Sequence, residues 1–441
     1  MTPAATQDDI ALRLDRLPVT ALHLLAVGLC AVGFALDTFE LALGGILAAV
    51  FSAPAHALPA RELSLLLASV YIGATIGAPL LGWLADRFGR RQLLMVLMLG
   101  LGAASLASAL SPSPALLALC RGLGGVALGA YPPIVIAYLT DLVPPTRRGM
   151  LIFAMVAFAS LGPPAGIFLV RFLTPLQPLG LEAWRWGFLA GGVGTAIVGA
   201  LFRLLPESPR WLQARGREAQ AEAAFARLQQ SRTMLAAVPR PVPAKAVGDD
   251  PVRPCALHQA VVAGIFLLSP WATVAFPILS GAVLAQKGYQ LSDTLLVLGL
   301  SWFGPLIGTL LASSSVDRLE RRVALCLCAV AMVAAGGLFV IGDGAAWLAA
   351  TSIAFTLASA LYVPTLTMYS AELFPTAARA RSLAAAWAFN RIGAAIAPML
   401  LLPLLHSAGA TAMFGVVALT LLGSLLLLGV APRGRQRMPV R

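Results

Sequence analysis

Two acidic side chains stand where a charge is costly. Of the nineteen acids, only Asp37 and Glu40 lie well inside an apolar run, from Leu17 to Phe51. They are three residues apart, so a helix would bring both to one face. An ionisable group deep in a membrane is functional by default, and burial favours a carboxylic acid's protonated form. The pair could carry one proton near neutral pH; a static ion pair with Arg121 is the alternative.

Two basic side chains, Arg121 and Arg391, also lie within apolar runs. Arg121 lies near the outer end of its apolar run, where its side chain could extend to the membrane surface. Arg391 lies well inside a later run, beside Asn390, and no acid falls within any run of that half. Its planar guanidinium suits a carboxylate, so Arg391 predicts an organic anion as substrate. A structural hydrogen bond to helix-end carbonyls is the alternative.

The elements that must position these groups are membrane helices. Apolar residues make up 59% of the chain and charged residues 11%, against about 25% charged in a soluble domain. A span needs about 20 mostly apolar residues. The sequence predicts an all-α membrane protein of twelve helices in two six-helix bundles. The predicted helices cover 18–50, 63–85, 92–111, 115–140, 149–172, 184–205, 257–284, 291–315, 323–342, 347–371, 381–404 and 409–431.

The net charge of +12 reflects topology and not nucleic-acid binding, because the arginines cluster in short loops on one side of the predicted helices. This asymmetry predicts that both termini are cytoplasmic. A cytoplasmic stretch, 206–256, divides the chain, and Glu218–Gln230 within it could form a short amphipathic helix. We therefore divide the chain into a tail (1–17), a first bundle (18–205), the linker (206–256), a second bundle (257–431) and a second tail (432–441). The five cysteines show no metal-site spacing, and we expect no cofactor.

The two halves share a repeat. A constant offset of 231 positions takes Asp86 to Asp317, Arg90 to Arg321 and Tyr131 to Tyr362. It also takes Asp141 to Glu372. Parallel repeats of this kind bring two bundles together around a central site near the bilayer midplane.

Several motifs resemble the major facilitator superfamily over almost the whole chain. The segment Gly82-Trp-Leu-Ala-Asp-Arg-Phe-Gly-Arg-Arg91 is similar to the signature loop between helices 2 and 3. Pro206–Leu212 and Tyr369–Arg379 resemble segments of the sugar-porter and organic-ion branches. Asp37–Glu40 looks most like the bacterial aromatic-acid and metabolite:proton symporters, although Thr38 stands where they usually have Gly.

The resemblance implies roles for named residues. Arg121 would pair with the deprotonated acid of the first helix, and a base at Arg391 is typical of anion carriers. Aromatic residues on the equivalents of cavity-lining helices could stack on the substrate, though lipid-facing or packing roles are open: Tyr131, Tyr362, Trp271, Trp302 and Trp387. A charged network would hold the cytoplasmic side closed when the outside is open; simple positive-inside anchoring is the alternative for each arginine. Its residues are Gly82, Asp86, Arg87, Gly89, Arg90, Arg91, Asp141, Arg148, Glu207, Arg210, Asp317, Arg318, Arg322, Glu372 and Arg379.

These features favour secondary active transport over other functions. We expect proton-coupled symport of a small organic anion by alternating access, in a monomer of the bacterial inner membrane. Proton-driven export of a hydrophobic compound, or facilitation of a sugar or organic ion, is the alternative. A sensor that had lost transport should have lost its buried acids. An enzyme is not expected, because the chain has no His cluster, Ser-His-Asp set or nucleotide loop.

Overall fold

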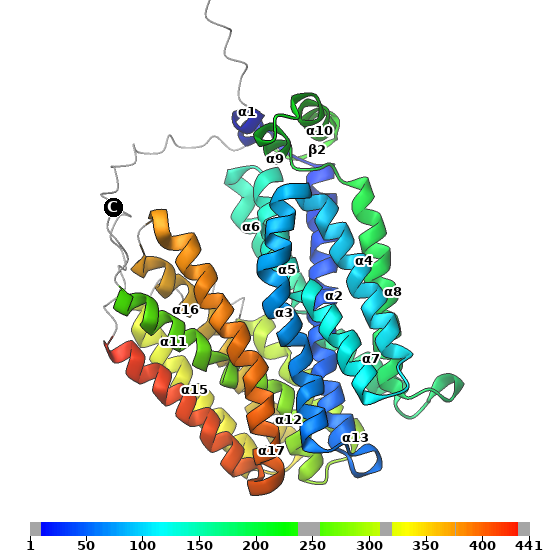
Figure 1. Ribbon diagram of the computed structural model, residues 1–441, viewed down its shortest axis with the longest axis vertical. Coiled ribbons are helices and arrows are strands. Elements are labelled where there is room, and N and C mark those ends of the chain that lie inside the picture. The colour runs from blue at the N-terminus through cyan, green and yellow to red at the C-terminus, as the bar shows by residue number, and fades with distance from the viewer. Residues whose placement is uncertain (1–9, 237–255, 309–319, 375, 431–441) are drawn as a thin grey trace, which may run out of the picture.

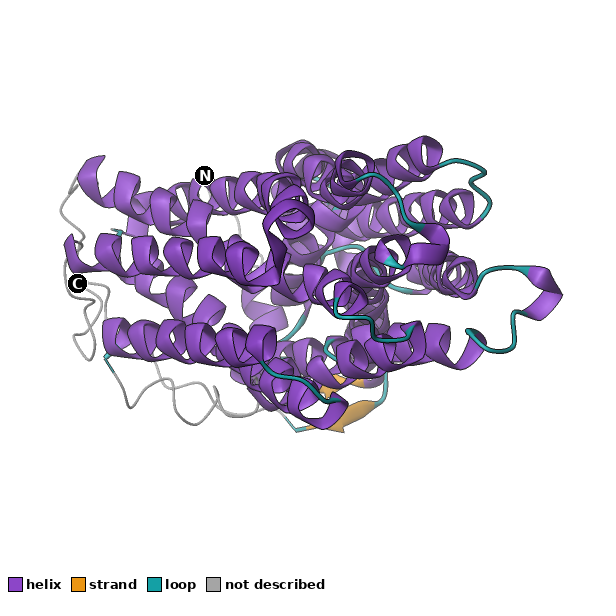
Figure 2. Cartoon of the chain, turned by 90° about the horizontal axis from the view of Figure 1, so that it is seen from below, coloured by secondary structure: helices purple, strands orange, loops and turns teal. Residues whose placement is uncertain are grey.

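Long apolar helices make up most of the protein (Figures 1 and 2). The computed structural model describes residues 10–236, 256–308, 320–374 and 376–430. Eleven segments of these residues are long and apolar enough to cross a membrane, and the last, Ser382–Val430, breaks at Gly409 (φ 82°, ψ 175°) into two. The prediction of twelve spanning helices is thereby confirmed. The first bundle contains α2 (Ala21–Ser52), α3 (Ala60–Phe88), α4 (Arg90–Ala109), α5 (Pro114–Leu142), α6 (Pro145–Ala159), α7 (Gly162–Leu173) and α8 (Ala183–Leu201).

The second bundle contains the remaining spans, and its first span is irregular. This span contains a π-helical turn, Trp271–Ala275, directly after Pro270. Proline lacks the N–H that would continue the ladder, so a local change of helix type is the expected response. The remaining elements are α11 (Ala256–Pro270), α12 (Phe276–Gln286), α13 (Leu291–Ser301), α15 (Arg321–Ile341), α16 (Ala345–Leu373) and α17 (Thr376–Val430).

Small residues allow the helices of the first bundle to approach closely. A Cβ added at Gly125 of α5 would lie 2.2 Å from the backbone oxygen of Val70 in α3. A Cβ added at Gly73 or Gly77 of α3 would likewise lie 2.0 Å from a backbone oxygen of α5. Without a hydrophobic force between helices in lipid, such close backbone contact is what stabilises their association. The α3–α5 pair is therefore a rigid wall of the bundle.

Short elements cover one end of the first bundle (Figure 1). The predicted amphipathic helix is present as α10 (Glu218–Gln230), and it buries Ala221, Phe225 and Leu228. The sequence reasoning missed its neighbour α1 (Ile10–Arg16), which packs on α10 and on α9 (Pro209–Ala214). It also missed an antiparallel pair of short strands. These are β1 (Val19–Thr20) and β2 (Thr233–Leu235).

Close contacts join the two bundles at the end away from this cover. The Arg171 guanidinium in α7 donates to the backbone oxygen of Ser292 in α13, at 3.0 Å. The side of Gly45 in α2 faces Leu298 of α13, and Gly281 of α12 lies against Ala49. At the covered end, the two bundles diverge in Figure 1. The structure thus holds the bundles together mainly at one membrane face.

Candidate functional site

Glu40 lies inside the first bundle. It is 3% exposed, and the Ser105 hydroxyl of α4 donates to its carboxylate. Gly191 of α8 leaves room for it, since a Cβ there would lie 2.3 Å from Glu40 Oε1. The positive charge that acts on Glu40 is that of Arg121. The carboxylate is therefore held by groups of its own bundle.

Arg121 turns into the bundle and not toward the membrane surface. Its side chain on α5 is 6% exposed, and its guanidinium carbon lies 5.3 Å from the centre of the Phe188 ring. A cation over an aromatic face is favourable, more so when desolvated. The Arg121 Nε atom has no hydrogen-bond partner among the described residues. The charge is thus compensated by Glu40 and the ring together.

Asp37 lies in the field of a charge from the other bundle. It is 1% exposed, and the positive group that acts on it is Arg391 of α17. Tyr71 of α3 lies in the field of both Arg391 and Arg121. Within the described chain, Asp37 Oδ1 has no hydrogen-bond partner. An acid of the first bundle and a base of the second are therefore close enough to interact electrostatically. The sequence reasoning missed Tyr71, because a single tyrosine in an apolar run has no distinguishing pattern.

Asn390 and Trp387 lie within about one helical turn of Arg391 on α17. The adjacent Asn390 donates through Nδ2 to Ser269 Oγ of α11, at 3.3 Å. The Trp387 ring packs edge-on against Phe266, with centroids 5.4 Å apart. Trp271 begins the π-helical turn and is half-buried. The Asn390 and Trp387 contacts hold α17 against α11 beside Arg391.

The other aromatic candidates are placed differently. Tyr131 and Tyr362, which the repeat relates, are both 0% exposed. The Tyr131 hydroxyl donates to the backbone oxygen of Cys30, at 3.2 Å, which ties α5 to α2. Tyr362 packs in the core of the second bundle, and Trp302 is half-buried after α13. Both tyrosines therefore lie in the packing of their own bundles in this conformation.

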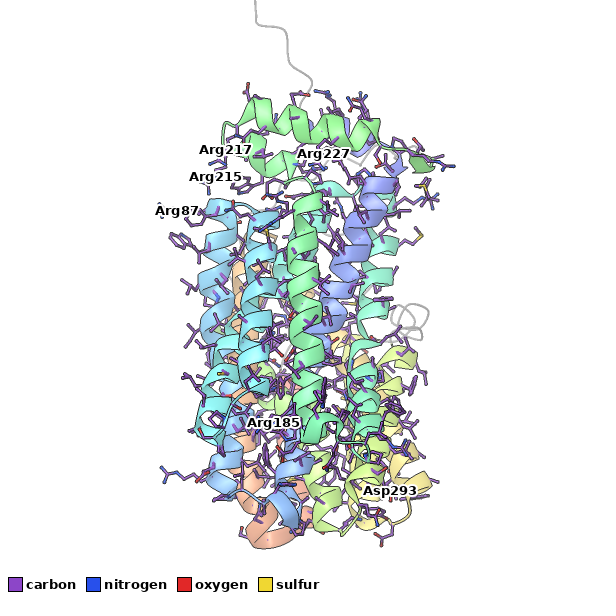
Figure 3. All side chains as sticks on the ribbon, turned by 90° about the vertical axis from the view of Figure 1, so that its right-hand side faces the viewer. Arg87, Arg185, Arg215, Arg217, Arg227 and Asp293 are labelled. Atoms are coloured by element: carbon purple, nitrogen blue, oxygen red, sulfur yellow. The ribbon has the colours of Figure 1, made fainter. Side chains whose placement is uncertain are left out.

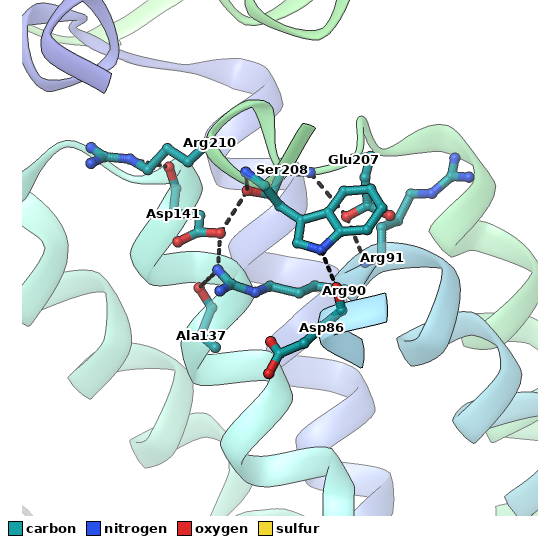
Figure 4. Close-up of polar contacts among 9 residues, drawn as sticks. Asp86, Arg90, Arg91, Ala137, Asp141, Glu207, Ser208 and Arg210 are labelled. Carbon is teal, nitrogen blue, oxygen red and sulfur yellow. Dashed lines mark hydrogen bonds and ion pairs between the residues drawn. The ribbon is translucent and has the colours of Figure 1, made fainter. Parts of the chain in front are cut away.

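The loop motif forms a network at the covered end of the first bundle (Figure 4). Arg90 makes an ion pair with Asp141, whose carboxylate also accepts from Ser208 Oγ at 2.6 Å. Arg210 Nε donates to the backbone oxygen of Asp141 at 3.1 Å, and its guanidinium pairs with Asp15 of α1. The sequence reasoning missed Ser208 and Asp15. This network joins α4, α5, α9 and α1.

A second set of contacts fixes the start of α4. Glu207 accepts from the backbone N–H groups of Arg91 (3.0 Å) and Gln92 (3.3 Å). An acid at a helix N-terminus satisfies unpaired donors and complements the helix dipole. Trp211 Nε1 donates to the backbone oxygen of Asp86 at 2.7 Å, which ties α9 to the end of α3. The Asp86 carboxylate itself is exposed and makes no hydrogen bond to any described residue.

The remaining motif residues have simpler surroundings. Gly89, buried between α3 and α4, adopts a left-handed backbone (φ 109°) that suits glycine. Gly82 has open space beside it, and Arg87 lies exposed over the Trp83 ring. Arg148 Nη2 donates to the backbone oxygen of Val143 at 3.3 Å.

The second bundle contains an equivalent of the Arg90–Asp141 pair. Arg321 Nε lies 3.3 Å from Glu372 Oε1, at the positions to which the repeat offset takes Arg90 and Asp141. Arg322 donates to the backbone oxygen of Gly429 at 3.2 Å. Each ion pair thus lies within one bundle. Asp317, Arg318 and the Arg379 side chain lie outside the described residues.

Two six-helix bundles joined around buried opposite charges define a membrane transporter. The chain belongs to the Major Facilitator Superfamily, whose family profile matches residues 25–398. The fold is similar to the xylose transporter XylE from E. coli in a partially occluded inward open conformation, with a TM-score of 0.74 and 18% identity over 95% of this chain and 100% of that one.

Relatives among known proteins match over different lengths. YdjK of Escherichia coli (strain K12) is 27% identical, over 97% of this chain and 96% of its own. The niacin transporter NiaP of Acinetobacter baylyi is 23% identical, over 97% and 98%. The gallate transporter of Pseudomonas putida is 32% identical, over 51% and 49%. The resemblance to the major facilitator superfamily is confirmed, and the protein is a transporter and not an enzyme.

Proposed function

We propose that the protein is a proton-coupled symporter of a small organic anion, with Asp37 as the proton site and Arg391 as the anion site. The observation that carries the proposal is that Asp37 on α2 of one bundle and Arg391 on α17 of the other lie close enough to interact electrostatically. A guanidinium in a water-poor site needs an anion or hydrogen-bonding groups to compensate it. In the empty, deprotonated protein, the Asp37 carboxylate is that anion.

Protonation then frees Arg391 for substrate. Once Asp37 is neutral, the guanidinium loses its counter-charge and attracts a carboxylate, which can accept two parallel hydrogen bonds. Proton and anion together leave the interface neutral, so the bundles can close around them at little electrostatic cost. Return of the empty carrier restores the Asp37–Arg391 attraction. Tyr71, near both arginines, is suited to contact the bound anion.

The chemistry of the relatives agrees with an anion. Niacin and gallate are both aromatic carboxylates, and NiaP and the gallate transporter carry those names. A sugar is the main alternative, since an arabinose-proton symporter of Bacillus subtilis is 33% identical over 36% of this chain. A sugar needs several hydrogen-bonding side chains around its hydroxyls. Asn390 is the single asparagine of the chain, which favours the anion.

The test compares an acid with its amide. Thermal-shift binding of nicotinate and nicotinamide, and of benzoate and benzamide, is measured on the wild type, Arg391→Lys and Arg391→Ala. We expect the acid alone to stabilise the wild type, with weaker binding to the lysine variant and none to the alanine variant. Arg61→Ala removes an exposed arginine elsewhere and is the control. Equal binding of acid and amide, or normal acid binding by Arg391→Ala, would refute the anion assignment.

The orientation of the protein in the membrane, its location and its oligomeric state are part of the same proposal. The arginine-rich loops and the cover of α1, α9 and α10 lie at one end of the first bundle, which the positive-inside rule assigns to the cytoplasm. We infer a monomer in the bacterial inner membrane with both termini cytoplasmic. On this assignment the bundles are in contact at the outer face. Proton-driven export, the remaining alternative, predicts alkalinisation on the opposite side when substrate is added outside.

A further inference from the structure

A basic pocket lies at the covered end of the first bundle, away from the bundle interface. It has a volume of about 310 Å³ and opens between the start of α4 and the helix α10. Three arginines line it: Arg91 from α4, Arg217 at the start of α10 and Arg227 from its last turn. Figure 3 shows Arg215, Arg217 and Arg227 gathered at this end of the molecule. The proton and anion sites proposed above include none of them.

The arginines are held in place with donors to spare. Arg91 Nη1 donates to the backbone oxygen of Leu205 at 3.2 Å, and Arg227 Nη2 to that of Leu204 at 2.8 Å. The buried Arg91 Nε has no partner in the described part of the chain. The Arg217 guanidinium lies over the Trp211 ring, 5.6 Å from its centre. A guanidinium has five N–H donors, so each of the three can still bind an acceptor.

The acid in the pocket does not cancel this charge. Glu207 already accepts three backbone N–H bonds, from Arg91, Gln92 and Ser208. Three positive side chains and one negative one leave the pocket with a net positive charge. It is therefore suited to an anion with several acceptor oxygens.

The surroundings of the pocket indicate where that anion comes from. The pocket lies at the ends of the candidate membrane spans Arg90–Ala109 and Ala183–Leu204. Val96 of α4, one turn beyond the lining residue Gln92, is 52% exposed. On the adjacent α8, Ile197 and Leu201 are 54% and 38% exposed at helical spacing, and Leu204 beyond it is 53% exposed. An apolar strip thus runs from the pocket toward the membrane interior.

We propose that this pocket binds the phosphate of an anionic membrane lipid, whose acyl chains lie along the α4–α8 strip. Arg91 contacts the phosphate from the bundle, and Arg217 and Arg227 contact it from the cover. The lipid therefore bridges α10 and α4 and stabilises the cover on the bundle. A free phosphate would use the same arginines but not the apolar strip.

The experiment measures lipid binding to the full-length protein in detergent. Native mass spectrometry titrates phosphatidylglycerol, phosphatidylcholine with the same acyl chains, and inorganic phosphate. We expect phosphatidylglycerol to bind most tightly, and Arg217→Gln/Arg227→Gln to weaken it about 25-fold, since each arginine near a membrane anion contributes about fivefold. Arg16→Gln/Arg232→Gln removes two exposed arginines outside the pocket and should change affinity less than twofold.

Because Arg227 also holds the chain at Leu204, Arg217→Gln alone serves as a second variant, with an expected loss of about fivefold. Unchanged affinity in Arg217→Gln would overturn the site. An equal loss of lipid affinity in the Arg16→Gln/Arg232→Gln control would overturn the site, because it would mean that general surface charge binds the lipid. Inorganic phosphate that binds as well as the lipid would overturn the lipid assignment.

Discussion

Replacement of Asp37 by Asn tests the proposed coupling most directly. The side chain is 1% exposed and the substitution keeps its shape, so the main change is the loss of a group that can release a proton. The Arg391 guanidinium then faces a neutral amide, as it would face a protonated Asp37. The variant should behave as a carrier fixed in its protonated form. We expect exchange of labelled for unlabelled substrate to continue and accumulation driven by a pH gradient to stop.

The accumulation that the variant should lose depends on how many protons the wild type carries with each anion. In the proposed cycle Asp37 carries the proton, whereas Glu40 accepts from Ser105 inside the first bundle and lies in the field of Arg121. One proton carried with one monovalent anion moves no net charge. Accumulation should therefore be about tenfold per pH unit and independent of membrane potential. A second proton would add about 2.3 kcal/mol per 100 mV, or a further factor of about fifty.

The assay uses proteoliposomes loaded with buffer one pH unit above the outside. Wild-type uptake of the labelled acid should approach tenfold accumulation, and a valinomycin-imposed potential should not change it. Glu40→Gln is the comparison, with slower uptake but the same final ratio. Uphill accumulation by Asp37→Asn would refute the assignment of the coupling group. A potential-dependent ratio in the wild type would refute the single-proton reasoning.

Further predictions concern the packing and the loop network, and each is checked by the unfolding temperature of the purified protein. Gly125→Ala adds a methyl 2.2 Å from a backbone oxygen of α3 and should destabilise the protein by about 1–3 kcal/mol, whereas Gly82→Ala, with open space beside it, should be nearly neutral. Asp141→Asn removes the counter-charge of half-buried Arg90, so we expect a loss of about 1–3 kcal/mol; no change would mean the pair is replaced by solvent. Trp211→Phe removes one hydrogen bond to the end of α3 and should cost about 1 kcal/mol; a loss above 3 kcal/mol would indicate a wider role for the ring.

The membrane architecture could be predicted because its physical constraint is local. A span must be apolar over its own length, so each helix shows in a single stretch of residues. The repeat offset added long-range information, and the structure places Arg321 and Glu372 together as it does Arg90 and Asp141. The short α1 and the β1–β2 pair were missed because their stability comes from contacts with residues about 200 positions later.

The sequence by itself determined which residues are chemically unusual, namely an acid pair and two bases in apolar surroundings. It could not determine their partners. Asp37 and Glu40 share a helix face, yet Asp37 lies in the field of Arg391 of the other bundle and Glu40 in the field of Arg121 of its own. The partner of each acid depends on how α2, α5 and α17 pack. A local sequence pattern does not indicate how one helix is rotated relative to another. Only the tertiary structure therefore shows which base lies in the field of each acid.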